Sequence, residues 1–205
     1  AYRDKYDRRG MRALEEPRLS KYLVNLYEEL YENEEFEEIE ILFEGAQGFG
    51  LDIDWGDYPY VTSSHCTVGS ALLNGVPAKA IRDVWGVAKI YETYVGGKDF
   101  EGIDEEFDLI REIGEEYGST TGRPRQINWL DFDLLKMAAR INGVNKLVIN
   151  KMDVLEEVDK WRAYNGPHVL EFKSRRDMEF WISTKLQVEV DDDIETFFSG
   201  DKEKI

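Results

Sequence analysis

The sequence contains little cysteine and histidine: Cys66 is the one cysteine, and His65 and His168 are the two histidines. An internal disulfide is therefore excluded, and this cysteine usage is typical of a reducing compartment, so we expect a cytoplasmic protein. No apolar run approaches the roughly 18 residues that span a bilayer, and the given sequence contains no signal-peptide pattern. We therefore expect no membrane partner.

Basic residues are also in short supply, since 26 Lys and Arg stand against 43 Asp and Glu, giving a net charge of −17. This balance argues against a general nucleic-acid binder. Two basic islands stand out against this background, one at Arg3, Lys5, Arg8, Arg9 and Arg12 and one at Arg123 and Arg125, and they suggest local anion sites. For the first cluster, scattered surface arginines explain the pattern equally well.

Strand-like and helix-like segments alternate along the chain, and we expect a single α/β domain over residues 1–205. No internal repeat or long linker interrupts the pattern. We expect helices over 17–38, 77–92, 130–142 and 175–182, an amphipathic segment over 104–116, strands over 40–43, 147–150 and 187–190, an extended piece over 51–55, and loops over 58–64 and 118–125.

The segment 147–153, Leu-Val-Ile-Asn-Lys-Met-Asp, is the most informative of these. A short β-branched apolar run predicts a buried parallel strand whose carboxyl end meets a ligand. The Asp153 carboxylate can accept two hydrogen bonds from the N1–H and N2–H₂ groups of guanine, a donor pair that adenine lacks, while the Lys151 stem can lie over the base. An ordinary Asn/Asp turn after a strand is the alternative.

Four segments, taken in order, resemble the adenylosuccinate synthetase family. They are AYRDKYDRRGMR (1–12), FEGAQGFGLDIDWGDYPYVTSS (43–64), GSTTGRPRQINWLD (118–131) and LVINKMDVL (147–155). The resemblance covers most of residues 1–155 and weakens afterwards. It implies a P-loop-NTPase-like α/β fold with a mainly parallel central sheet flanked by helices. It also implies that this chain is the later, C-terminal portion of a homodimeric synthetase.

Members of this family couple L-aspartate to IMP with GTP, giving adenylosuccinate, GDP and phosphate in purine biosynthesis. The resemblance implies that GTP first phosphorylates the 6-oxygen of IMP, and that the aspartate amine then displaces the phosphate, with Mg²⁺ assisting. The family's phosphate loop, general-base aspartate, catalytic histidine and Mg²⁺ ligands match nothing in this sequence. We therefore expect no metal ligand in this chain and no activity from the chain alone.

For the nucleotide substrate, the resemblance gives Gln47 a supporting catalytic role beside the purine and assigns Arg8, Gln47, Thr62 and Arg123 to IMP. Thr62 would bind the 5′-phosphate and Arg123 the ribose. The resemblance also implies that Arg8 reaches the IMP phosphate in the neighbouring subunit of a homodimer, and a guanidinium can bind such a phosphate bidentately. A loop glutamine and a turn threonine are the plain structural alternatives.

For the other two substrates, the resemblance places aspartate on the loop at 118–125 and GTP on the segment after residue 150. Two arginines can clamp two carboxylates, and Gly122 allows a loop to swing. The aspartate-binding residues would be Ser119, Thr120, Thr121, Gly122, Arg123 and Arg125. The GTP-binding residues would be Arg125, Lys151, Met152, Asp153, Ser199 and Gly200.

Several departures leave the purine substrate open. His65 and Cys66 replace the family's Asn-Thr, and the usual Ala-Gly-Pro-Phe-Pro-Thr-Glu run is missing after Gly97. Phage relatives that put aspartate onto dGMP are therefore an alternative, as is a non-catalytic, dimer-forming remnant. A GTP-binding switch protein would explain residues 150–153, but not the loop at 118–125 or the segment around Gln47.

Overall fold

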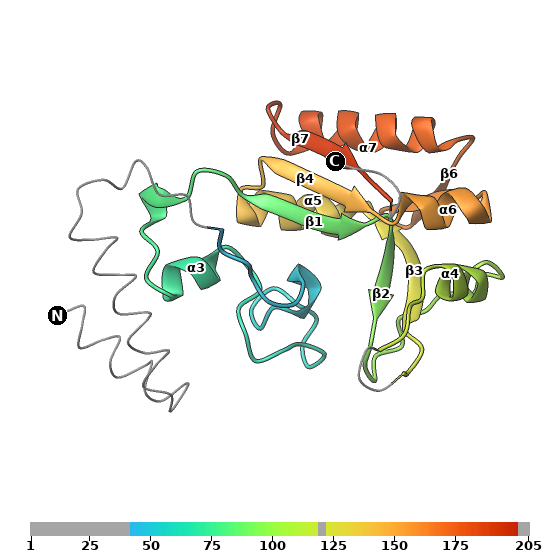
Figure 1. Ribbon diagram of the computed structural model, residues 1–205, viewed down its shortest axis with the longest axis horizontal. Helices are drawn as coiled ribbons and strands as arrows, with labels where there is room; N and C mark the ends of the chain where they lie inside the picture. The colour runs from blue at the N-terminus through green and yellow to red at the C-terminus, as the bar shows by residue number, and fades with distance from the viewer. Residues whose placement is uncertain (1–41, 119–121, 201–205) are drawn as a thin grey trace. The chain divides into compact units, whose positions relative to one another are not determined.

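The computed structural model describes residues 42–118 and 122–200. The chain divides into two compact units, residues 1–44 and 45–205, and the second is described here (Figure 1). Only residues 42–44 of the first unit are described, so the expected single domain stays a prediction. The expected helix over 17–38 lies outside the described residues, as do Arg8, Ser119, Thr120 and Thr121.

A three-stranded parallel sheet with the order β1-β4-β7 forms the framework. Its strands are β1 (Trp85–Lys89), β4 (Lys146–Asn150) and β7 (Glu195–Phe198). The central strand β4 pairs with both neighbours in parallel, and its three middle residues are buried. A strand covered on both faces needs a continuous apolar run, which explains the sequence of this segment. The expected strand over 147–150 and the parallel sheet are confirmed.

A second, mixed sheet has the order β2-β3-β5-β6. It contains β2 (Tyr91–Tyr94), β3 (Gln126–Asp131), β5 (Trp161–Asn165) and β6 (His168–Phe172). The β3–β5 pair is parallel and the other two pairs are antiparallel. One buried residue, Ile90, links β1 to β2, and its N–H donates to the Asn150 carbonyl at 3.0 Å. Figure 1 shows β2 and β3 extending away from the parallel sheet, with α4 alongside β3.

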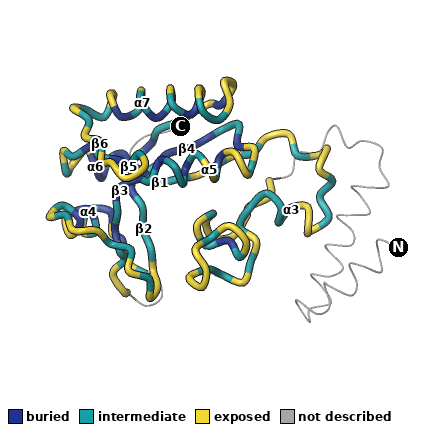
Figure 2. The backbone as a smooth tube through the Cα atoms, turned by 180° about the vertical axis from the view of Figure 1, so that it is seen from behind, coloured by how far each residue is buried: buried dark blue, intermediate teal, exposed yellow. Residues whose placement is uncertain are grey.

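The helices join both sheets through one apolar core. Helix α5 is capped at its start by Asp131, whose carboxylate accepts the Leu134 N–H, and at its end by Gly143 in the left-handed conformation. Helix α7 buries Met178, Ile182 and Leu186, which recur every four residues, so its backbone alternates between buried and exposed in Figure 2. The helices are α3 (Gly69–Leu73), α4 (Phe107–Ile113), α5 (Phe132–Asn142), α6 (Met152–Val158) and α7 (Arg175–Glu189), with 3₁₀ turns η1 (Phe49–Leu51) and η2 (Ala78–Ala80).

The expected helix over 77–92 is wrong. The segment contains the short turn η2, then β1 and β2. Its Val, Trp and Tyr residues suit strands as well as helices, and pairing with β4 and β3 decides between the two. Val87 is 71% exposed on β1, so the apolar positions do not form one buried helical side.

Three shorter expectations also need correction. Residues 51–55 are not extended, because η1 leads into a turn organised by Asp52. Residues 42 and 43, the described part of the expected strand over 40–43, belong to no strand. The expected strand over 187–190 is the end of α7, which continues to Glu189, and the strand lies later, at β7.

The other expectations hold, with shifted boundaries. Helix α5 fills most of 130–142, α7 includes 175–182, and 58–64 is a loop. The amphipathic segment over 104–116 contains α4, which buries Phe107 and Ile110. Within the described ranges, no helix combines the length and the apolar character needed to cross a membrane. The expected α/β class, with a parallel sheet flanked by helices, is confirmed.

Candidate functional site

The carboxyl ends of β4 and β7 are tied together directly. The N–H of Ser199 donates to the Ile149 carbonyl at 2.9 Å, and the N–H of Met152 donates to the Ser199 carbonyl at 3.1 Å. Between these bonds the chain turns sharply at Lys151, which has a φ of 64° and precedes the first residue of α6. The left-handed conformation is uncommon for a residue with a side chain and marks a tightly specified turn.

Asp153 and Gly200 are in contact at this edge. A β-carbon placed on Gly200 would lie 2.8 Å from Cβ, Cγ and Oδ1 of Asp153, so only glycine fits there. Four of the residues expected to bind GTP, Lys151, Asp153, Ser199 and Gly200, are thus brought together. The Met152 side chain is fully buried in the core, so Met152 can offer a ligand only its backbone.

The Asn150 side chain presents an unused acceptor at the same edge. Its Oδ1 atom is buried and has no hydrogen-bond partner among the described residues. Buried polar atoms are nearly always paired, and an exception calls for an explanation such as a ligand. The end of β4 therefore offers a polar group that an incoming donor could satisfy.

A buried carboxylate, Glu116, lies beside this edge and binds three side chains. Its Oε1 accepts from Lys89 Nζ at 2.6 Å and from the Tyr91 hydroxyl at 2.9 Å, while its Oε2 accepts from Arg125 at 2.8 Å. Burial alone would raise the pKa of Glu116, but Lys89, Tyr91 and Arg125 outweigh it and hold that pKa below its usual value. The carboxylate is therefore ionised at neutral pH.

The Glu116 cluster, Lys89, Tyr91, Glu116 and Arg125, adjoins the end of β4. The Lys151 ammonium donates to the carbonyl of Gly114 at 3.3 Å, two residues before Glu116. Lys89 also donates to Thr93 at 3.1 Å. The structure thus brings the expected GTP-binding segment close to Arg125. The sequence analysis did not assign Lys89 or Glu116 to the site. The position of Glu116, an acidic residue just before the Gly-Ser-Thr-Thr-Gly-Arg segment, could have indicated its part in the site.

The residues that flank 119–121 form a closed backbone arrangement. The Gly122 N–H donates to the Gly118 carbonyl at 2.7 Å, and the Gly118 N–H donates to the Arg123 carbonyl at 2.8 Å. Gly122 has a φ of 62°, which a residue with a side chain adopts only at a cost. The arrangement continues with the Arg125 N–H donating to the Glu116 carbonyl at 2.9 Å, so both backbone and side chain fix Arg125 to Glu116.

Gln47 and Thr62 lie on a separate loop that Asp52 organises. Asp52 is fully buried, and its carboxylate accepts the N–H groups of Asp54, Trp55 and Cys66. Thr62 donates its N–H to the Leu51 carbonyl at 2.8 Å. Gln47 is exposed and has a φ of 66°. The structure therefore places Gln47 and Thr62 on one loop, but does not place either in the Glu116 cluster.

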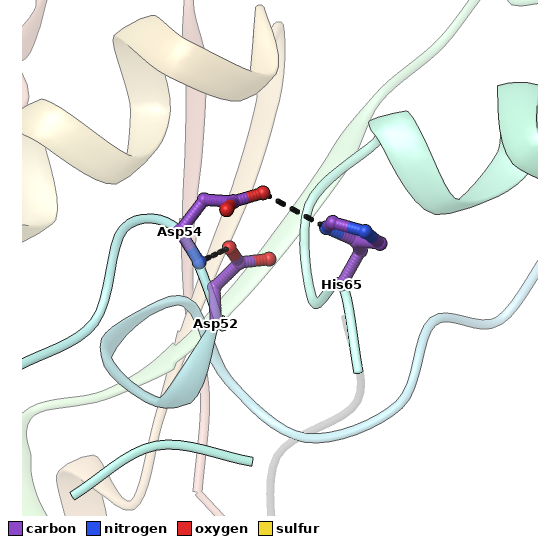
Figure 3. Close-up of side chains that lie close together, drawn as sticks. All are labelled: Asp52, Asp54 and His65. Carbon is purple, nitrogen blue, oxygen red and sulfur yellow. Dashed lines mark hydrogen bonds and ion pairs between the residues drawn. The ribbon is translucent and has the colours of Figure 1, made fainter. Parts of the chain in front are cut away.

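Asp52, Asp54 and His65 are close enough to share a cation (Figure 3). His65 Nδ1 lies 3.2 Å from Asp54 Oδ2, and both side chains are largely exposed. Burial would raise the pKa of Asp52, but its backbone N–H donors outweigh this and lower the pKa. Both oxygens of Asp52 already accept hydrogen bonds, so anchoring the loop explains the grouping. Burial raises the pKa of the neighbouring Cys66 thiol, which argues against a reactive thiolate.

These features define an α/β protein whose candidate ligand groups gather at the carboxyl edge of a parallel sheet, the usual position for a ligand in such folds. The chain belongs to the adenylosuccinate synthetase family, whose model matches residues 8–168. It is 55% identical over 126 residues to the adenylosuccinate synthetase of Xanthomonas campestris pv. campestris (strain B100), covering 60% of this chain and 29% of that protein.

Two further comparisons agree. The adenylosuccinate synthetase of Deinococcus radiodurans is 49% identical over 134 residues, or 62% of this chain and 33% of that protein. The solved structure of the fully ligated enzyme from Plasmodium falciparum matches with a TM-score of 0.60 at 33% identity, covering 76% of this chain and 41% of that one. The chain thus spans about a third of the length of the curated relatives it matches.

Proposed function

We propose that this chain is the GTP- and aspartate-binding portion of an enzyme that ligates L-aspartate to IMP, forming a carbon–nitrogen bond. GTP is consumed, and adenylosuccinate, GDP and phosphate are released. One observation carries the proposal: Asp153 and Gly200 adjoin Lys151, and Lys151 in turn contacts the segment that holds Arg125 through Glu116. A guanine-binding site at Asp153 and an aspartate-binding site at Arg125 can therefore lie at the same carboxyl edge of the parallel sheet.

Guanine recognition follows from the chemistry of Asp153. A carboxylate only accepts hydrogen bonds, so it matches the N1–H and N2–H₂ donors of guanine and opposes the N1 acceptor of adenine. Gly200 packs against that carboxylate and holds it in place, because any side chain at position 200 would collide with Asp153. Lys151 and Ser199 complete the base site that we propose.

Aspartate recognition rests on Arg123 and Arg125. An arginine pairs with a carboxylate through two parallel hydrogen bonds, and two arginines can hold both carboxylates of a dicarboxylic amino acid. The backbone at these two arginines is held by described bonds, since the Arg123 carbonyl accepts the Gly118 N–H and the Arg125 N–H donates to the Glu116 carbonyl. Ser119, Thr120 and Thr121 are proposed to add hydroxyl donors.

The reaction is proposed to proceed in two steps. The 6-oxygen of IMP attacks the γ-phosphorus of GTP and releases GDP, which turns a poor leaving group into phosphate. The amine of aspartate then attacks carbon 6, and phosphate leaves. In this scheme the residues of this chain bind and orient: Gln47 at the purine, Thr62 at the 5′-phosphate and Arg123 at the ribose.

The described residues do not fit a Mg²⁺ site for this reaction. One acidic grouping includes an imidazole, which Mg²⁺ rarely takes, and contains the loop anchor Asp52. The other, Asp191, Asp192 and Asp193, is an exposed run next to β7. We therefore assign no step through a metal to these residues. Arg8 is proposed to complete the site of a partner subunit, in a cytoplasmic homodimer that needs neither nucleic acid nor membrane.

Calorimetry tests the proposal on the complete polypeptide whose reading frame contains this chain. We expect a GTP analogue to bind at least about tenfold more tightly than the matching ATP analogue, and Asp153→Asn to remove most of this preference. With the GTP analogue present, IMP should bind more tightly than GMP or dGMP. Equal binding of the two analogues would contradict the guanine site.

Two other results would redirect the proposal. Tighter binding of dGMP than of IMP would indicate the phage-type reaction on a 2-aminopurine nucleotide. Nucleotide binding without turnover of IMP, GTP and aspartate would indicate a non-catalytic member of the family. Exposed Asp54 provides the matched control, since Asp54→Asn makes the same chemical change away from the base site and should leave the GTP preference unaltered.

A further inference from the structure

We propose that Glu116 is a positioning residue that fixes Lys89 and Arg125 for an anionic substrate, so that its charge sets the affinity for aspartate. This inference rests on the proposed function and deepens it. Glu116 would not touch the substrate. It would act through two cations, one at the carboxyl end of β1 and one beside the turn at Gly122.

Burial and bonding show that Glu116 is committed to this cluster. Its side chain is 2% exposed, and each carboxylate oxygen is paired with a different cation. An ionised carboxylate is taken out of water only at a large cost, which several strong hydrogen bonds must offset. Lys89, Tyr91 and Arg125 provide three such bonds. Lys89 and Tyr91 lie at the junction of β1 and β2, whereas Arg125 lies far along the chain, so Glu116 joins these two parts.

The cations themselves remain within reach of a ligand. The Lys89 side chain is 25% exposed and the Arg125 side chain is 32% exposed, in contrast to Glu116. Each therefore has one side bound to the carboxylate and another side open to solvent. This is the arrangement expected of groups held ready for an anion, and it differs from a fully enclosed structural ion pair.

The charge balance also favours an anion. Lys89 and Arg125 bind one carboxylate, and Lys151 lies nearby. The pKa of Lys89 is lowered mainly by burial; Glu116 opposes this shift, and Arg125 and Lys151 add to it. Glu116 neutralises one positive charge, and an incoming carboxylate or phosphate would neutralise more. Without Glu116, repulsion would drive Lys89 and Arg125 apart. Even with the Asp153 carboxylate, which also acts on Tyr91 of this cluster, the cations outnumber the carboxylates, and this favours a negative ligand.

Steady-state kinetics of Glu116→Gln in the complete polypeptide test the inference. The amide keeps the size of the side chain but removes the charge that holds both cations. We expect the KM for aspartate to rise by about tenfold or more, while the KM for IMP and kcat change by less than about threefold. Glu112→Gln, an exposed glutamate on α4, should match the wild type.

A second measurement separates this inference from the proposed function. The Nε–Hε signal of Arg125, assigned with Arg125→Lys, reports how firmly the guanidinium is held, whether or not the enzyme turns over. We expect a distinct signal in the wild type and a broadened or shifted one in Glu116→Gln. An unchanged signal together with an unchanged KM for aspartate would overturn the positioning role, whereas failure of wild-type turnover would count only against the proposed reaction.

Glu116→Asp keeps the test decisive if the glutamine variant does not fold. It retains the charge but is one methylene shorter, so it cannot reach Lys89 and Arg125 in the same geometry. The KM for aspartate should then rise more than the KM for IMP. Wild-type values of both constants in a folded Glu116→Asp protein would contradict the inference.

Discussion

Gly200 lies directly against the carboxylate of Asp153, so closely that a β-carbon at position 200 would be 2.8 Å from Oδ1. Gly200 follows strand β7, and Asp153 lies in α6, which follows strand β4. Gly200, which has no side chain to bind a ligand, therefore fixes the position of the Asp153 carboxylate that we propose binds the base. A change at position 200 should act on the nucleotide site through Asp153.

Gly200→Ala is expected to weaken binding of a GTP analogue by about tenfold or more, because the new methyl group must displace the Asp153 carboxylate. Calorimetry of the variant measures the effect. Gly97→Ala is the control, since a β-carbon at position 97 meets nothing within 4 Å and should leave affinity unchanged. Equal affinities of the two variants would show that Asp153 does not contact the nucleotide.

Asp52→Asn is expected to lower the free energy of unfolding by about 3 kcal/mol, because an amide replaces a buried carboxylate that accepts three backbone N–H groups. Since these bonds lower the pKa of Asp52, its contribution exists above about pH 4 and is lost as the pH falls further. Urea denaturation at pH 7 measures the difference. Asp54→Asn, at a side chain that is 68% exposed, should change stability by less than about 0.5 kcal/mol.

Glu92 should make the protein less stable as the pH rises. Burial and the nearby Asp131 raise the pKa of Glu92 to about 7. The folded state thus holds this proton more tightly than the unfolded state does, so stability falls between about pH 4.5 and pH 7 and then levels off. Glu92→Gln is therefore expected to gain about 3 kcal/mol of stability at pH 8 and about 1 kcal/mol or less at pH 5.

Denaturation curves of Glu92→Gln and the wild type at the two pH values give this difference directly. The matched change Glu195→Gln, at an exposed position on β7, controls for the loss of one negative charge from an acidic chain. The same gain at pH 5 and pH 8 would mean that Glu92 is ionised throughout, and would contradict the raised pKa.

Ile149→Ala is expected to cost about 2–5 kcal/mol, since this fully buried side chain lies on the central strand and its loss leaves a cavity. Thermal or urea unfolding measures the loss. Val87→Ala truncates a side chain on the paired strand β1 that is 71% exposed, and should cost about 0.5 kcal/mol or less. Similar losses in the two variants would argue against the central position of β4.

Local patterns in the sequence predicted the elements that local chemistry decides. The β4 segment is apolar over three successive residues and ends in polar ones, as a strand buried on both faces requires. Helix α5 begins at a side-chain cap, Asp131, and ends at a glycine, Gly143, and both signals are visible in the sequence. The start of this helix lies two residues later than expected, because residues 130 and 131 belong to strand β3.

The segment 77–92 was misassigned because its identity depends on distant partners. Val84 and Val87 fit a helical spacing, yet residues 85–89 pair with β4 and residues 91–94 pair with β3. Those partners lie far along the chain, and no local pattern announces them. The later strands β5, β6 and β7 were missed or misplaced for the same reason, since each is short and acquires its form from its neighbours.

The amino-acid sequence determined the acidic character of the protein, the parallel strand at 147–150 and the polar residues at its end, because these follow from composition and from the order of neighbouring residues. Only the tertiary structure decided that Gly200 contacts Asp153 and that Glu116 joins Lys89 to Arg125. The physical reason is that such close approaches depend on how strands pair and on which charges are buried together. Both are set by the packing of segments that are remote in the chain.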